Sequence, residues 1–172
     1  MTATGPTVNG SSGTKEQVDT AAVWVREFAA GWRDPAGPEE FAAHFEALVD
    51  PDFRLVQPML PTVNGLGQWR EGFVRPTFAA LPDLRAEVDR WASSGDTVYI
   101  EFTMIATVGR REVRWPAVDR FTLRGGRPVE RVSYFDPLPL AGAVARTPRA
   151  WPRFLRGQAM QLRYLLRRRS SR

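Results

Sequence analysis

The spacing of apolar residues changes at residue 84, and that change limits the possible folds more than any other feature. Before residue 84, apolar residues recur at steps of three and four, which is typical of amphipathic helices. From residue 84 to residue 136, apolar and polar residues alternate, as in strands with one buried face. Helices followed by a meander of long strands predict an α+β fold, with the helices on one face of a curved antiparallel sheet.

Three helices are expected in the first half of the chain. Apolar positions predict a first helix over residues 18–32, a second over 41–49 and a third over 69–78. Proline restricts the residue before it, so Pro76 is expected to bend or end the third helix. Residues 53–57 alternate in polarity and predict a short strand between the second and third helices.

Glycine-containing turns divide the alternating region into four strands. The expected turns are at Ser93–Asp96, Gly109–Arg111 and Gly125-Gly126. With these turns, each strand is adjacent in the sheet to the next strand in sequence. We expect one domain over residues 15–140, preceded by a disordered leader at 1–14 that is rich in Gly, Ser and Thr.

The positive charge is confined to the C-terminal segment. The net charge is +5, but residues 141–172 hold nine arginines and no acidic residue, whereas residues 1–140 are net acidic. A nucleic-acid role inferred from the overall charge would therefore be wrong for the domain. The chain has no cysteine and one histidine, His44, which excludes disulfides and thiolate chemistry and gives no basis for a metal site.

One acidic residue lies on a strand face that is otherwise apolar. The residues that share this face are Trp115, Ala117, Asp119, Phe121 and Leu123. A buried carboxylate is costly unless it is paired, protonated or used in chemistry. Burial would raise the pKa of Asp119 and make it a proton donor, whereas a structural ion pair with Arg131 would lower that pKa.

Several stretches, in order along residues 15–140, resemble the nuclear transport factor 2-like superfamily and its SnoaL-like polyketide cyclase branch. The stretches are Gly31–Asp34, Phe41–Asp52, Gly65–Phe73, Leu81–Leu84 and Gly126–Leu140. The resemblance implies a cone-shaped fold, a deep apolar pocket between the sheet and the helices, and a homodimer. It also places an acid/base aspartate at Asp119, and an enzyme of this type needs no cofactor.

The resemblance further implies which residues contact a ligand. The pocket positions are Gln57, Trp115, Arg131, Ser133 and Phe135, beside Asp119. The aspartate base of the ketosteroid isomerases falls on Gln57, whose amide cannot accept a proton from carbon. The Arg-x-Asp pair of the limonene epoxide hydrolases falls near Glu101 and Thr103. These replacements argue against both reactions and favour a cyclase or isomerase acting on a hydrophobic, polyketide-like or terpenoid-like molecule.

The alternative function is a non-catalytic ligand-binding or dimerisation protein. In either case the chain has no apolar run long enough to span a membrane, which predicts a cytoplasmic protein. Residues 148–169 predict an amphipathic helix. Its apolar side either packs on the domain or across a dimer, with its arginines facing the acidic domain, or binds an anionic membrane surface peripherally together with those arginines. Nucleic acid is disfavoured as a partner because this tail has few aromatic residues for base stacking.

Overall fold

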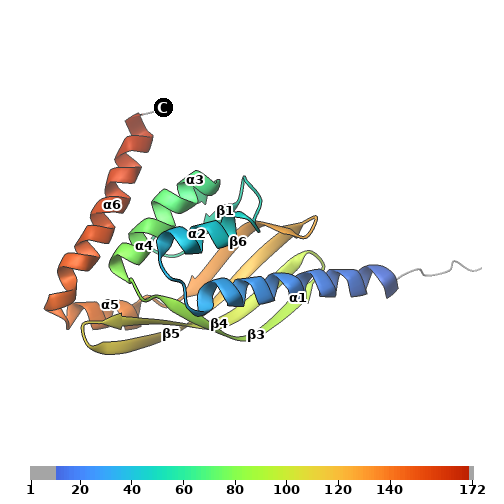
Figure 1. Cartoon of the computed structure of the whole chain (residues 1–172), viewed down its shortest axis with the longest axis horizontal. Helices are drawn as coiled ribbons and strands as arrows, with labels where there is room; N and C mark the ends of the chain where they lie inside the picture. The colour runs from blue at the N-terminus through green and yellow to red at the C-terminus, as the bar shows by residue number, and fades with distance from the viewer. Residues whose placement is uncertain (1–10, 171–172) are drawn as a thin grey trace, which may run out of the picture.

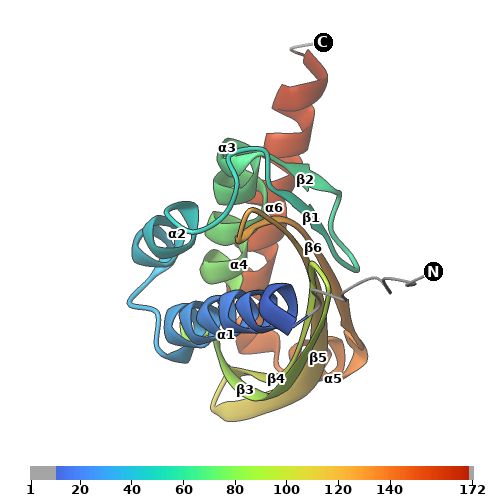
Figure 2. The same cartoon turned by 90° about the vertical axis from the view of Figure 1, so that its right-hand side faces the viewer.

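A single curved sheet of six strands wraps around the first helix (Figure 2). In the computed structural model, residues 11–170 are described, with their side chains from residue 19 to residue 167. The strands are β1 (Arg54–Val56), β2 (Val63–Asn64), β3 (Arg85–Ser94), β4 (Thr97–Val108), β5 (Arg111–Arg124) and β6 (Arg127–Phe135). Their order is β2-β1-β6-β5-β4-β3, with β1 parallel to β6 and the other pairs antiparallel. The expected meander is therefore confirmed.

The helices cover the concave side of this sheet, and one further helix lies outside them (Figure 1). They are α1 (Ser11–Arg33), α2 (Pro38–Glu46), α3 (Leu66–Trp69), a π-helical turn (Arg70–Val74), α4 (Arg75–Ala80), α5 (Leu138–Ala145), a 3₁₀ turn (Pro148–Ala150) and α6 (Trp151–Ser170). Of the predicted disordered leader, residues 1–10 lie outside the described part, and residues 11–14 belong to α1. Among the described helices, none is long and apolar enough to cross a bilayer.

Aromatic side chains from α1 and α2 fill the concave face of the sheet. Phe28 is the centre of this cluster: its ring centroid lies 5.3 Å from that of Phe102 and 5.5 Å from that of Phe121. Most of these ring pairs are tilted or edge-on, which is the favourable arrangement for aromatic quadrupoles. The first helix is thus fixed to the sheet by close aromatic packing as well as by buried area.

The third predicted helix does not end at Pro76. It runs from Leu66 to Ala80 as α3, the π-helical turn and α4, with Pro76 in the first turn of α4. A proline ring normally clashes with the carbonyl four residues before it. The wider π-helical turn directly before Arg75 places an extra residue in the helix, which relieves this clash and lets the helix continue.

The last helix packs on α4 through small and polar residues. A Cβ atom built on Gly157 would lie 2.7 Å from the backbone oxygen of Pro76 and 3.0 Å from the Cβ of Ala80, so the two helices approach as closely as glycine permits. Gln161 is buried on the same side, and Tyr164 lies against Gly72. Packing of the tail leucines on this domain, one of the expected arrangements, is therefore wrong: Leu155, Leu162 and Leu166 are 66%, 57% and 53% exposed. Packing of that side across a dimer stays a prediction.

Replacing Gly157 with alanine is expected to loosen α6, although alanine is the better helix former. The added methyl would overlap a backbone carbonyl oxygen that cannot rotate away. Overpacking of this kind costs about 1–3 kcal/mol, and the gain in helix propensity offsets about 1 kcal/mol. Limited trypsin digestion, which cleaves after the α6 arginines, should therefore be faster for Gly157→Ala than for wild type. The control is Gln158→Ala at the next, exposed position; equal rates for both variants would contradict the prediction.

Candidate functional site

A cavity of about 120 Å³ lies between the sheet and the α3–α4 helix. All six residues that the sequence singled out line it: Gln57, Trp115, Asp119, Arg131, Ser133 and Phe135. The remaining walls are apolar except for Thr77 of α4, and they come from the helices, from the segment between α4 and β3, and from β4 and β5. The structure thus brings the polar candidates together on the floor of an otherwise hydrophobic chamber, which is the usual composition of a small-molecule site.

Strand register explains why three polar side chains meet on this floor. In the β5–β6 ladder, Asp119 is opposite Ser133, and Arg131 is opposite Phe121. Residues that alternate along a strand share a face, so Asp119, Arg131 and Ser133 all point to the concave side. The two intervening side chains, Arg120 and Val132, lie on the other face. The neighbouring strands β5 and β6 therefore supply the carboxyl group of Asp119, the guanidinium group of Arg131 and the hydroxyl group of Ser133.

Asp119 and Arg131 form a buried ion pair. The Nε atom of Arg131 lies 2.6 Å from Oδ2 of Asp119. Asp119 has no exposed surface, and Arg131 is 7% exposed. The Nε–H bond is not aligned with the carboxylate as in a hydrogen bond, and Oδ1 has no hydrogen-bond partner among the described residues. The pair is therefore monodentate, and part of the hydrogen-bonding capacity of the carboxylate is unused.

Two aromatic rings hold the guanidinium group of Arg131. Its central carbon lies 5.7 Å from the ring centroid of Trp32 and 5.8 Å from that of Phe73. Both distances are within the range of cation–π attraction. Trp32 comes from the end of α1 and Phe73 from the π-helical turn, so two helices fix the arginine against the sheet. Arg131 is more exposed than Asp119 and Ser133, and its side chain carries five N–H donors.

Burial raises the pKa of Asp119 above its ordinary value. The positive charge of Arg131 and the nearby hydroxyl of Ser133 oppose this rise without cancelling it. The sequence argument expected that an ion pair with Arg131 would lower this pKa; the pair forms, but complete burial outweighs it. A carboxyl group of this kind can hold a proton at a pH at which an exposed aspartate is ionised.

The cavity continues into an outer vestibule of about 450 Å³. Gln57, Thr77, Leu81, Phe135 and Leu140 line both spaces and therefore mark the passage between them. The outer walls are α4, α5 and α6 together with the loop that holds Met59. Sequence reasoning missed this vestibule because it did not predict α5, whose apolar residues 138–145 have a weak helical period.

Several polar side chains outside this set have structural contacts away from the cavity. The Nε2 atom of His44 lies 2.9 Å from the backbone oxygen of Glu27, in a contact between α2 and α1. Asp136 accepts a hydrogen bond from the backbone N–H of Leu138 at the start of α5. Glu101 pairs with Arg90. Within residues 11–170, no three His, Asp or Glu side chains cluster in a way that would hold a metal ion.

Comparison with protein families matches residues 25–131 to the SnoaL-like domain. Among curated proteins, none matches the sequence. Solved structures with the same architecture include a proposed SnoaL-like polyketide cyclase from Jannaschia sp. CCS1, with 23% identity and a TM-score of 0.62. That similarity covers 76% of this chain and 92% of the other.

Two further structures are similar over most of their length. TerC, co-crystallised with polyporic acid, has 19% identity and a TM-score of 0.59 over 78% of this chain and 99% of its own. An epoxide hydrolase from M. tuberculosis that resembles limonene epoxide hydrolase has 17% identity and a TM-score of 0.59, over 77% of this chain and 95% of its own. At these identities, the structural likeness establishes the fold and leaves the chemistry to the residues of the site.

Proposed function

The chain belongs to the SnoaL-like domain family, whose fold is used by small-molecule-binding isomerases and cyclases, and we propose that it is a cofactor-independent enzyme of this kind. The substrate would be a hydrophobic, oxygen-bearing molecule of polyketide or terpenoid type. The observation that carries the proposal is the buried trio of Asp119, Arg131 and Ser133 on the floor of an apolar cavity that opens through a vestibule. Apolar walls bind the carbon skeleton, and a few polar groups orient it.

Each member of the trio has a role in this proposal. Asp119 is the acid/base: its carboxylate takes a proton from a carbon next to a carbonyl group, and its carboxyl later returns that proton to the alkoxide formed by ring closure. Arg131 donates N–H bonds to the enolate oxygen while the negative charge is there. The enolate carbon attacks a second carbonyl of the same molecule, so the reaction needs no other reactant. Walls that hold the two ends of the substrate together lower the entropic part of the barrier.

A non-catalytic ligand-binding protein is the second candidate, and one observation favours it. The carboxylate of Asp119 has no exposed surface and lies against Arg131, so a ligand on the cavity floor meets the guanidinium group first. In this alternative Arg131 binds an oxygen of the ligand, and Asp119 only positions Arg131. Catalysis by Asp119 requires the arginine side chain to move aside when substrate binds.

Replacing Asp119 with asparagine distinguishes the two candidates. We expect wild-type protein, purified gently from its own host, to retain a small hydrophobic molecule in native mass spectrometry. If Asp119 is the acid/base, Asp119→Asn should retain a molecule of different structure, the unconverted substrate, because the reaction slows by roughly 10²–10⁴-fold. Chromatography of the released ligand, with tandem mass spectrometry, detects the change even when ring closure leaves the mass unaltered.

The matched control is Asp89→Asn, which removes a carboxylate on β3 that bonds Thr103 instead of lining the cavity. It should retain the same molecule as wild type. If Asp119→Asn also retains that molecule, at whatever occupancy, acid/base chemistry at Asp119 is excluded and the binding-protein alternative holds. Polyporic acid, with which the similar TerC structure was crystallised, is a defined first probe, and its binding can be followed through the fluorescence of Trp32 and Trp115 in the cavity wall.

A further inference from the structure

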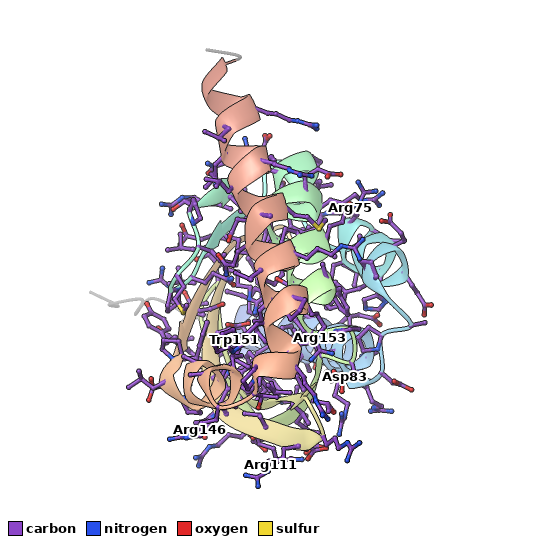
Figure 3. The ribbon with its side chains drawn as sticks, turned by 90° about the vertical axis from the view of Figure 1, so that its left-hand side faces the viewer. Arg75, Asp83, Arg111, Arg146, Trp151 and Arg153 are labelled. Atoms are coloured by element: carbon purple, nitrogen blue, oxygen red, sulfur yellow. The ribbon has the colours of Figure 1, made fainter. Side chains whose placement is uncertain are left out.

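The outer face of α6 carries an apolar stripe that nothing in the described part of the chain covers. Trp151, Leu155, Leu162 and Leu166 fall within an arc of about 60° when residues are placed at about 100° intervals around a helix. All four are roughly half exposed or more. The opposite side of the helix holds Gly157 and Gln161 and is the side that packs on α4. Seen from this side, α6 lies in front of the rest of the molecule (Figure 3).

A row of arginines runs beside this stripe. Arg156, Arg163 and Arg167 lie roughly 60–100° further around the helix, still on its outward side. Arg156 and Arg163 form no ion pair with any carboxylate among the described residues. By contrast, Arg153 is turned away from Trp151 and donates to the backbone oxygen of Thr107 (Figure 3). The glutamates Glu39, Glu46 and Glu71 of α2 and the π-helical turn pair instead with Arg70 and Arg75.

This combination fits one kind of partner better than others. An apolar stripe next to Arg156 and Arg163, in a segment with nine arginines and no acid, is complementary to an anionic lipid surface. Leucines enter the boundary between headgroups and acyl chains, and arginines contact the lipid phosphates. A second copy of this chain would have to offset that positive charge with carboxylates, and its own C-terminal segment would add nine more arginines and no acid.

We propose that α6 docks this protein peripherally on an anionic bilayer, with the stripe of Trp151, Leu155, Leu162 and Leu166 inserted and the arginine row on the headgroups. The docking places the vestibule at the membrane, because Leu155 belongs both to the stripe and to the vestibule wall. Met59, which is 71% exposed, lies on the opposite side of the same opening. A hydrophobic ligand can then pass between bilayer and cavity without crossing water. The docking itself does not depend on the reaction proposed above.

Vesicle co-sedimentation of the full chain tests the proposal without reference to activity. We expect binding to phosphatidylcholine vesicles that contain phosphatidylglycerol, little binding to phosphatidylcholine alone, and weaker binding at high salt. Arg156→Gln/Arg163→Gln should weaken binding on the order of 30-fold, the product of two lost surface charges. Leu155→Gln/Leu162→Gln should weaken it by about tenfold or more without unfolding the protein, because both leucines are exposed.

The control pair is Arg26→Gln/Arg124→Gln, which removes two exposed arginines from α1 and from the end of β5 and should leave binding within about twofold of wild type. Three results would overturn the proposal. One is no sedimentation with the anionic vesicles at low salt. Another is equal weakening by the control pair, which would mean unspecific charge attraction. The third is a change in sedimentation velocity of the leucine variant with vesicle binding intact, which would make the stripe an interface between copies, as in the homodimer that the sequence predicts.

Discussion

Replacing Arg131 with methionine is expected to lower the free energy of unfolding by about 3–5 kcal/mol at neutral pH. The reason is the state in which the substitution leaves Asp119. Its carboxylate is fully buried, and the only cation in contact with it among the described residues is the guanidinium group 2.6 Å away. Removing one partner of a buried ion pair leaves a charge that neither water nor protein compensates. Urea denaturation followed by tryptophan fluorescence measures the change.

Two further variants establish whether the loss comes from the unpaired charge. Arg131→Met/Asp119→Leu should recover most of the lost stability, because replacing both partners by apolar side chains leaves no buried charge. Arg120→Met removes the neighbouring arginine, which pairs with Glu130 on the outer face, and should cost about 0–1 kcal/mol. If Arg131→Met costs no more than Arg120→Met, Asp119 is already neutral in the folded protein and the pair is not ionic.

The deficit of Arg131→Met should also depend on pH in a definite direction. Burial raises the pKa of Asp119, and Arg131 opposes that rise, so the pKa of the folded variant is higher than that of the wild type. A carboxyl with a raised folded-state pKa contributes stability fully below its unfolded pKa, and that contribution is lost as pH rises through the folded pKa. The free energy of unfolding of the variant should therefore approach that of wild type below about pH 4, and the difference should grow as the pH increases.

Replacing Phe28 with alanine is the second change expected to have a large effect, a loss of about 3–5 kcal/mol. Phe28 is almost fully buried, and its ring contacts those of two other helix residues, Trp24 and Trp32, as well as the sheet. The tight aromatic surroundings cannot collapse into the space left by the ring, so a cavity adds to the lost transfer free energy. Val23→Ala, at an exposed position of the same helix, should stay within about 0.5 kcal/mol of wild type. Similar values for the two variants would mean that α1 is not fixed to the sheet through Phe28.

The strands and turns could be predicted because their signals are local. Alternating polarity placed Asp119 among buried apolar residues, and the turns at Gly95 and Gly109 confirm the expected strand ends. The family resemblance implied that Arg131 and Ser133 lie beside Asp119, and the alternation of side chains in β5 and β6 explains why they do. Alternation could not predict whether burial or the ion pair dominates the pKa of Asp119. That outcome depends on the rings that enclose Arg131, which come from α1 and the π-helical turn.

The orientation of α6 could not be predicted for a different reason. Its apolar side was one of two candidates for the side that packs, yet the close approach to α4 is made by Gly157, which contributes nothing to an apolar pattern. Hydrophobic periodicity identifies the faces that bury apolar side chains. The contact between α6 and α4 forms instead because glycine has no side chain and lets the two backbones approach closely. Pro76 was misleading in a similar way, because the π-helical turn that accommodates it has no signature in spacing.

The register of β5 against β6 gives the ion pair a consequence for folding fidelity. If β5 slipped by one residue, its side chains would exchange faces, and Asp119 would leave the concave side on which Arg131 remains. A sheet assembled in that register would bury a guanidinium group without a counterion. Apolar residues alone discriminate less sharply, because leucine and phenylalanine pack tolerably against many neighbours. The two opposite charges therefore disfavour a misaligned sheet at the stage when the helices cover its concave face.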